Sequence, residues 1–405
     1  MYDDILPRVK SDFDRMVSDR RYLHAHPGVS FDISETLDFV SGCLDEMGVA
    51  YERIGRAGLV ASVGDTARGK TFLVRADMDA LPIREQSGCE FAAANGCMHA
   101  CGHDLHTAML LEAARVLKTL EGELSGRVLL MFQPSEETFE GARDMIDAGL
   151  FERYTVDAGM MEHVTIGLPC PVGTVVVNDP GVSAPAADYF SIDIQGHGCH
   201  GSMPNVGIDP ITVAAHTVLA LQEIHARELA MSDEAVLTIG SIHAGDVGNA
   251  IPDTAQLHGT IRTYDEALRA KIKERMVCIA EGVAAMYRAT AAVSFGSGCP
   301  TLLNDAHVAH GVCAYAQELL GEETAFPVSE FSQHVGADMP RAMGSEDFSY
   351  VSHCIPTVMV SLAAGNAESG NVYPQHHPQV TFDEKAMVNG AAVYAYAAMR
   401  WLEDN

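Results

Sequence analysis

The order of apolar and polar positions predicts alternating helices and strands through the first part of the chain. Residues 72–75 and 128–132 are short apolar runs of the kind that parallel sheets bury on both faces. Between them, residues 104–118 have apolar side chains at helical spacing. An earlier helix is predicted over 34–47, where Gly48 provides a natural C-terminal stop. The pattern therefore indicates an α/β architecture.

The same series continues on both sides of a central interruption. A predicted helix over 141–148 leads into an expected strand over 157–161. Beyond residue 298 the alternation of helices and buried strands resumes, with a buried strand over 357–361 and a closing helix over 384–402. Successive units of this kind favour a mostly parallel sheet with helices on both faces.

The central segment has a different pattern. Residues 189–194 alternate apolar and polar side chains, as expected of a strand with one solvated face. The remaining elements predicted for this segment are helices over 210–227 and 266–286 and strands over 236–242, 255–261 and 290–295. Two helices set against an antiparallel sheet make an α+β sandwich. We therefore expect an inserted domain over 185–297 and a surrounding domain over 1–184 and 298–405.

Length and charge narrow the functional classes. A chain of 405 residues exceeds what one hydrophobic core usually supports, which favours two domains. The 55 acidic residues outnumber the 26 basic ones, and the formal charge of -29 would repel phosphate backbones and anionic lipids. We therefore expect no nucleic-acid partner and no membrane partner. A well-solvated acidic surface is the simplest explanation of the charge.

The N-terminus and the cysteines indicate the compartment. Residues 1–20 lack the apolar core of a signal peptide, and no apolar run reaches the length of a membrane span. The ten cysteines are scattered without dense, regular spacing, as is common for reduced thiols. The sequence thus predicts a cytoplasmic protein.

Three histidines, a cysteine and an aspartate crowd residues 98–106, next to a predicted helix. Thiolate and imidazole both bind transition metals, and Cys101 with His103 can face one ion from a loop. The alternative is a helix start capped by Asp104 with exposed histidines. A zinc ribbon fits less well, because no second cysteine pair follows at suitable spacing.

Carboxylates and further histidines occur near the ends of other predicted strands. Glu136 and Glu137 follow a buried strand at its C-terminal end, where open α/β sheets usually hold their sites. One carboxylate can bind metal while the other takes a proton from an activated water, although a glutamate pair is often just a solvated loop. His163 and the pair His376 and His377 fall where extended segments should deliver them to the same edge.

Together these motifs resemble the aminoacylase-like metallopeptidases, metallopeptidase family 20. The resemblance is to their amidohydrolase branch, with hippurate hydrolases and indole-acetyl-amino-acid hydrolases. It extends over nearly the whole chain and rests on seven motifs in family order. They are Leu23-His-Ala-His-Pro-Gly28, Arg75-Ala-Asp-Met-Asp-Ala-Leu-Pro82, His99-Ala-Cys-Gly-His-Asp104, Gln133-Pro-Ser-Glu-Glu137, Gly196-His-Gly-Cys-His200, Gly259-Thr-Ile-Arg262 and Gly344-Ser-Glu-Asp-Phe348.

The resemblance implies Glu136 as the general base and a binuclear site for two divalent ions, zinc or manganese. The implied metal ligands are Cys101, His103, Glu137, His163 and His376. Cys101 stands where a bridging aspartate occurs in the wider family, and the family pattern of His, any residue, Pro favours His376 over His377. Asp77 and Asp79 would then orient ligands and basic partners.

The resemblance also implies that the inserted domain mediates a homodimer and closes over substrate. His200 would reach across the dimer interface to polarise the scissile carbonyl oxygen, and Asn249 and Arg262 match positions that contact substrate. The planar fork of arginine suits a substrate carboxylate. The alternative for Arg262 is a surface salt bridge in an acidic protein.

The predicted activity is hydrolysis of the amide bond of an N-acyl amino acid, a small-molecule substrate. A dipeptidase or carboxypeptidase of the same family is the nearer alternative. A non-catalytic binding protein that has kept the fold is the more distant one. The presence of Glu136 and of a complete set of implied ligands argues against a binding protein.

Overall fold

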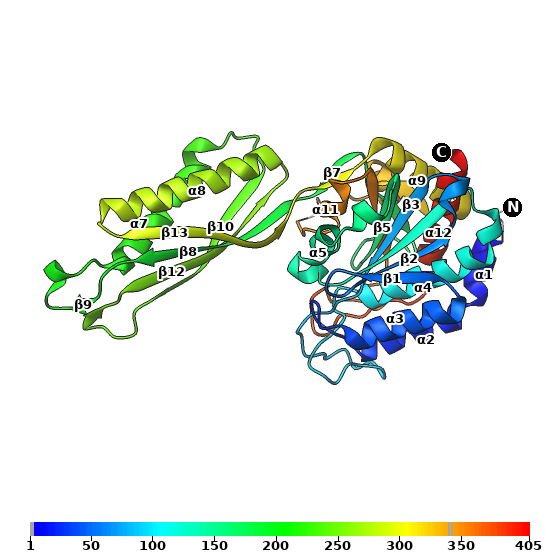
Figure 1. Cartoon of the computed structure of the whole chain (residues 1–405), viewed down its shortest axis with the longest axis horizontal. Coiled ribbons are helices and arrows are strands. Elements are labelled where there is room, and N and C mark those ends of the chain that lie inside the picture. The colour runs from blue at the N-terminus through cyan, green and yellow to red at the C-terminus, as the bar shows by residue number, and fades with distance from the viewer. Residues whose placement is uncertain (1–3, 339–340, 342) are drawn as a thin grey trace. The chain divides into compact units, whose positions relative to one another are not determined.

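The computed structural model describes residues 4–338, 341 and 343–405. The chain divides into two compact units (Figure 1). The first contains the chain up to Ser183, Leu303–Arg341 and Glu346–Asn405, and the second contains Ala184–Leu302 with the short stretch before Glu346. Each unit has its own sheet and its own hydrophobic core.

The first unit is built on an eight-stranded sheet with a parallel centre. Its strand order is β1-β2-β4-β3-β5-β16-β6-β15. The strands are β1 (Ala50–Ile54), β2 (Gly58–Gly64), β3 (Thr71–Asp77), β4 (Arg127–Gln133), β5 (Ala158–Thr165), β6 (Val175–Val177), β15 (Ala325–Pro327) and β16 (Thr357–Ala363). Neighbours among β4, β3, β5 and β16 pair in parallel, whereas β2 joins β4 and β6 joins β16 antiparallel. The parallel strands therefore end at one common edge.

Helices flank this sheet and complete its core. α4 (His103–Thr119) and α12 (Ala386–Asp404) pack against each other, and α4 is buried from His103 to Leu117. The other helices are α1 (Ile5–Ser11), α2 (Phe13–Ala25), α3 (Ser34–Met47), α5 (Gly141–Asp147), α6 (Leu150–Arg153), α9 (Ala306–Leu320), α10 (Phe331–Val335) and α11 (Ser349–Ser352). The expected α/β class, a mostly parallel sheet flanked by helices, is confirmed.

The second unit is an antiparallel sheet with two helices. The sheet has the order β10-β12-β8-β13. Its elements are β8 (Ala186–Gln195), β10 (Ala235–Ala244), β12 (Thr254–Thr263), β13 (Thr290–Cys299), α7 (Pro210–Glu223) and α8 (Glu266–Met286), with a small ribbon of β9 (Cys199–His200) and β11 (Ala250–Ile251). α7 and α8 contact each other and the sheet, which is the α+β arrangement expected from the sequence. β7 (Gly181–Ala184) and β14 (Leu302–Asn304) pair where the chain passes between the units.

Local sequence explains why these elements form. In β8, Phe190 and Ile192 are buried while Tyr189 and Asp193 are exposed, so one face packs on the helices and the other meets solvent. α8 begins where the Asp265 carboxylate accepts the backbone N–H of Leu268. Among the described residues, every helix is too short or too polar to span a bilayer.

Some elements differ from their predicted bounds. β5 runs to Thr165 instead of ending at residue 161, because its parallel pairing with β16 continues as far as Ala363. Glu162 and His163 interrupt the apolar run there, so the pattern alone ends the strand too early. The helix expected over 210–227 is α7 followed by a π turn at Ile224–Glu228. The antiparallel hairpin β1–β2 and the short strands β6 and β15 were not predicted.

Candidate metal centre

Side chains from four segments meet at the carboxyl edge of the parallel strands, where open α/β sheets hold their binding sites. β5 carries His163 close to its end, and β4 is followed by the 3-10 helix η3 (Glu136–Thr138). α4 starts at His103, shortly after Cys101, and His376 lies between β16 and α12. The structure brings together here Cys101, His103, Glu136, Glu137, His163 and His376.

Two groups of possible metal ligands share the Cys101 sulfur. Cys101 lies with His103 and His163 in one group and with Glu137 and His376 in the other, and the ligand atoms of each group are within 4.8 Å of one another. The Cys101 Sγ is 3.6 Å from Nε2 of His163 and 3.3 Å from Nε2 of His376. A tetrahedral ion with ligands at about 2.0–2.3 Å needs donor atoms at about these separations. One sulfur between two such groups can bridge two ions.

Hydrogen bonds to the backbone decide which nitrogen each imidazole presents. His103 donates from Nδ1 to the carbonyl of Asp79 at 2.9 Å, and His163 donates from Nδ1 to the carbonyl of Val164 at 2.7 Å. In each ring Nε2 then keeps its lone pair for a metal. Among the described residues, His103 Nε2 and Glu137 Oε1 are buried without a hydrogen-bond partner. Buried polar atoms rarely stay unpaired, so this set of donors fits a bound cation.

Neighbouring charges decide the protonation of these side chains. Burial and Glu137 oppose ionisation of Cys101, but His163 and His103 outweigh them and lower the pKa of the thiol to about 6. Burial opposes protonation of His163, yet the Cys101 thiolate raises the pKa of His163 to about 9. The hydrogen bond with the Cys101 sulfur and the nearby Glu137 carboxylate, 3.4 Å from Nε2, raise the pKa of His376 to about 10. The anionic donors thus favour positive charge beside them, whether protons or divalent cations supply it.

Glu136 lies buried beside these groups. Burial, followed by the charges of Glu346 and Glu137, raises the pKa of Glu136 well above its usual range. Its Oε2 is 4.0 Å from Nε2 of His103. A carboxyl group with a raised pKa can hold a proton near neutral pH and exchange it with a reactant.

The backbone around Glu136 is held in an uncommon conformation. Ser135 and Phe139, on either side of η3, both have φ of 57°. The Asp79 carboxylate accepts the N–H of Glu136 at 3.0 Å and the N–H of Glu137 at 3.2 Å. Backbone strain of this kind persists where surrounding contacts enforce it, as at many functional sites.

A buried arginine, Arg75, links three of the sequence motifs through hydrogen bonds. Arg75 donates to Gln133 Oε1 at 2.9 Å, Asp77 Oδ2 at 2.8 Å and Glu346 Oε1 at 2.8 Å. Asp347 Oδ1 accepts a further bond from Arg75 at 3.2 Å. These charged residues are all buried, so their mutual pairing is what makes their burial tolerable.

His106 connects this cluster to the segment after His163. Its Nδ1 is 2.6 Å from Asp77 Oδ1, and its Nε2 accepts the N–H of Val164 at 2.8 Å. Arg75 lies in one of the seven motifs and His106 ends the histidine-rich run 98–106, but neither residue was predicted to have a role. The sequence feature that could have predicted a role for them is a polar or charged residue inside a run that is otherwise apolar and buried.

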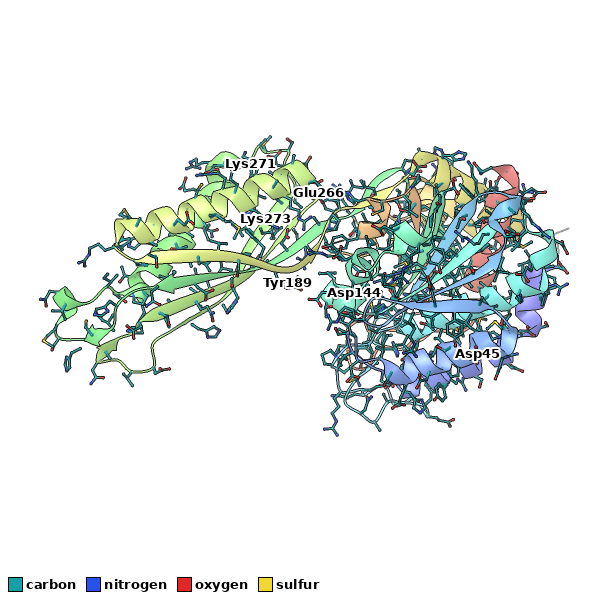
Figure 2. All side chains as sticks on the ribbon, viewed as in Figure 1. Asp45, Asp144, Tyr189, Glu266, Lys271 and Lys273 are labelled. Carbon is teal, nitrogen blue, oxygen red and sulfur yellow. The ribbon has the colours of Figure 1, made fainter. Side chains whose placement is uncertain are left out.

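The other predicted site residues lie in the second unit. His200 is in β9 and pairs with Ala250, and the carbonyl of Asn249 accepts the N–H of Gly201 at 2.8 Å, so His200 and Asn249 belong to one ribbon. Both side chains are exposed. Arg262 is not brought together with them: it lies near the other end of β12, half-buried, with its guanidinium 5.6 Å from the ring centroid of Tyr189. Figure 2 labels Tyr189 on the second unit.

Known proteins match this chain over most of its length. The model of peptidase family M20/M25/M40 matches residues 73–400. An N-acetyl-L-cysteine deacetylase of Bacillus subtilis is 34% identical over 393 residues, 96% of this chain and 89% of that protein. A thermostable carboxypeptidase of Saccharolobus solfataricus is 32% identical over 408 residues, 98% of this chain and 99% of that protein. A crystal structure of a Bacillus subtilis protein described as a dinuclear metal binding peptidase from the M20 family has a TM-score of 0.78 and 31% identity, covering 97% of this chain and 99% of that one.

With the paired groups of candidate ligands, these matches make the chain a metal-dependent hydrolase. It belongs to peptidase family M20/M25/M40. The resemblance inferred from the seven sequence motifs is therefore confirmed.

Proposed function

We propose that the chain hydrolyses the amide bond of N-acyl amino acids at a site for two divalent ions. The observation that carries this proposal is the sharing of Cys101 by two groups of ligand atoms, with the carboxyl group of Glu136 beside them. The deacetylase relative supports an N-acyl amino acid as the class of substrate.

In this proposal two ions, zinc or manganese, are held by Cys101, His103, Glu137, His163 and His376. Thiolate and imidazole suit zinc, and the carboxylates admit manganese. Bound divalent ions would supply Lewis acidity, which polarises an amide carbonyl and brings the pKa of a water molecule down to about 7.

Glu136 is proposed to move the proton. As a base it takes the proton of the attacking water, and as an acid it gives that proton to the nitrogen of the leaving amine. The Asp79 carboxylate, through the N–H groups of Glu136 and Glu137, keeps the base next to the ligand groups. The burial of Glu136 favours the protonated form that the second step needs.

Residues of the second unit are proposed to complete the site. His200 would donate a hydrogen bond to the oxyanion from the partner subunit of a homodimer, and Asn249 and Arg262 would bind substrate, the arginine through the substrate carboxylate. Residues 185–297 would then be the lid and dimerisation domain, inserted in a catalytic domain of 1–184 and 298–405. The ten cysteines are scattered without dense, regular spacing, which supports the proposal of a cytoplasmic protein.

The test is amine release from N-acetyl, N-benzoyl and indole-acetyl amino acids and from dipeptides. The protein is first stripped of metal and then supplied with zinc or manganese, and Glu136→Gln is the inactive control. We expect turnover of at least one acylated amino acid, dependent on metal and abolished in the control.

Other outcomes would move the assignment. Turnover of peptides alone would favour the carboxypeptidase activity that the Saccharolobus relative suggests. If protein that binds metal released no amine from any of these substrates, a binding protein that has kept the fold would be favoured.

A further inference from the structure

Gln375, the residue before His376, places its amide group between two other segments of the candidate centre. Its Nε2 is 2.9 Å from the carbonyl oxygen of Cys101, 3.2 Å from that of Val164 and 3.6 Å from the Cys101 Sγ. All three partners are hydrogen-bond acceptors. The amide nitrogen, and not the amide oxygen, must therefore face them.

These contacts join parts of the centre that are far apart in sequence. Cys101 precedes α4, Val164 belongs to β5, and Gln375 lies between β16 and α12. His376 itself has φ of 64°, and its backbone N–H donates to the carbonyl of Ala100 at 2.9 Å. A non-glycine residue adopts that conformation rarely, so the segment needs contacts that hold it. The Gln375 amide supplies such contacts one residue away.

We propose that Gln375 is a positioning residue of the metal centre. Its amide holds the His376 segment against Cys101 and Val164 and also polarises the Cys101 sulfur. The inference rests on the proposed function, since it requires that Cys101 and His376 bind metal. A hydrogen-bond donor beside a metal-bound thiolate withdraws electron density from the sulfur, so the sulfur donates less charge and the ions remain more electrophilic.

The chemistry of glutamine fits this place better than that of other residues of similar size. A leucine would take one hydrogen-bond donor away from each of the two carbonyl oxygens and from the sulfur. A glutamate would set a carboxylate against three acceptors. A lysine would bring a positive charge that competes with the metal ions for the same anionic donors.

The experiment loads metal-stripped protein with Co²⁺, whose thiolate complexes absorb through sulfur-to-metal charge transfer. In Gln375→Leu we expect the charge-transfer band to move to lower energy than in the wild type, because the sulfur has lost a donor. We also expect the dissociation constant for Co²⁺ to rise about 10- to 100-fold. Gln379→Leu is the matched control: Gln379 lies in the same segment, and within the described residues its side chain makes no hydrogen bond. It should keep the wild-type band and affinity.

A second variant guards against a folding defect. Gln375→Asn keeps an amide but withdraws it by one methylene group, and it should shift the band and the affinity in the same direction. If both variants match the wild type in band energy and affinity, the proposal is overturned. Because no substrate is used, failure of the amidase assay leaves this test intact. If the wild-type protein gave no charge-transfer band with Co²⁺, the proposed metal centre would be contradicted, and the role of Gln375 with it.

Discussion

The Asp79 carboxylate accepts the backbone N–H of Glu136 at 3.0 Å and, through its second oxygen, the N–H of Glu137 at 3.2 Å. One fully buried side chain thus fixes the turn that carries both the proposed base and a proposed ligand. Each oxygen has its own donor, so the contact depends on a carboxylate rather than on a polar group of similar shape.

We therefore predict that Asp79→Asn lowers kcat by about 10- to 100-fold with little change in KM or metal content. Asparagine offers one acceptor, and its NH₂ group would face the second backbone N–H. The measurement is steady-state kinetics with metal analysis. Asp65→Asn is the control, because Asp65 accepts the N–H of Ala67 at an exposed helix start where asparagine can do the same. Equal kinetics for Asp79→Asn and wild type would contradict the positioning role.

Substitutions of Glu136 and His103 should have different effects on metal content and turnover. Glu136→Gln is expected to retain both metal ions while kcat falls by at least about 100-fold, since only proton transfer is lost. His103→Ala is expected to lose metal, because Nε2 of His103 lies among the ligand atoms. Metal content and kcat of the two variants separate these outcomes. A Glu136→Gln protein with wild-type turnover would contradict the proposed mechanism.

Glu162 should make the fold less stable as the pH rises. Its two carboxylate oxygens are buried with no hydrogen-bond partner among the described residues, and burial raises the pKa of Glu162 well above its usual range. Below a pH of about 4.3 the group is neutral in both the folded and the unfolded chain. Above that pH the unfolded chain releases its proton while the folded chain keeps it, so stability falls by up to about 1.4 kcal/mol per pH unit.

Glu162→Gln removes this titration. We expect the free energy of unfolding of the variant to exceed that of the wild type by an amount that grows between about pH 5 and about pH 8. Urea unfolding at several pH values measures the difference. Glu323→Gln, at a side chain that is 98% exposed, is the control and should show no such trend. Parallel pH profiles for Glu162→Gln and wild type would show that Glu162 titrates normally.

Removal of metal should lower the thermal stability. Cys101 and Glu137 place negative charge in one buried region. An ion that binds only the folded chain stabilises it by about 2.7 kcal/mol at 100 times its Kd. A chelator should therefore lower Tm, and zinc or manganese should restore it. His103→Ala should respond far less to added metal. An unchanged Tm in chelator-treated, metal-free protein would argue against the proposed ligands.

Mixing two inactive variants tests the proposed role of His200. If His200 acts in the site of the partner subunit, hybrid dimers of Glu136→Gln and His200→Ala contain one site with both residues intact. We expect some activity to return after subunit exchange. Exchange that is confirmed by labelled subunits but brings no recovery would place His200 and Glu136 in the same subunit or remove His200 from the mechanism.

Local pattern was sufficient for most of the core elements. The helix predicted over 34–47 coincides with α3, and the runs at 72–75 and 128–132 lie within β3 and β4. Helical periodicity and continuous apolar runs are properties of neighbouring residues, so a single sequence contains them. β1 and β2 were missed because β1, the edge strand, pairs only with β2, and β2 joins the rest of the sheet only through β4, a partner about 70 residues away.

The sequence by itself determined which side chains are available for chemistry. Cys101, His103, Glu136 and Glu137 stand in dense motifs, and those residue types bind metals and carry protons wherever they are placed. The tertiary structure decided how they meet. The common edge of four parallel strands sets two groups of candidate ligands around one sulfur, and hydrogen bonds of Asp79, His106 and Gln375 hold these segments together. Their roles arise from hydrogen bonds across 50 or more positions of the chain, and such contacts exist only once the sheet has formed.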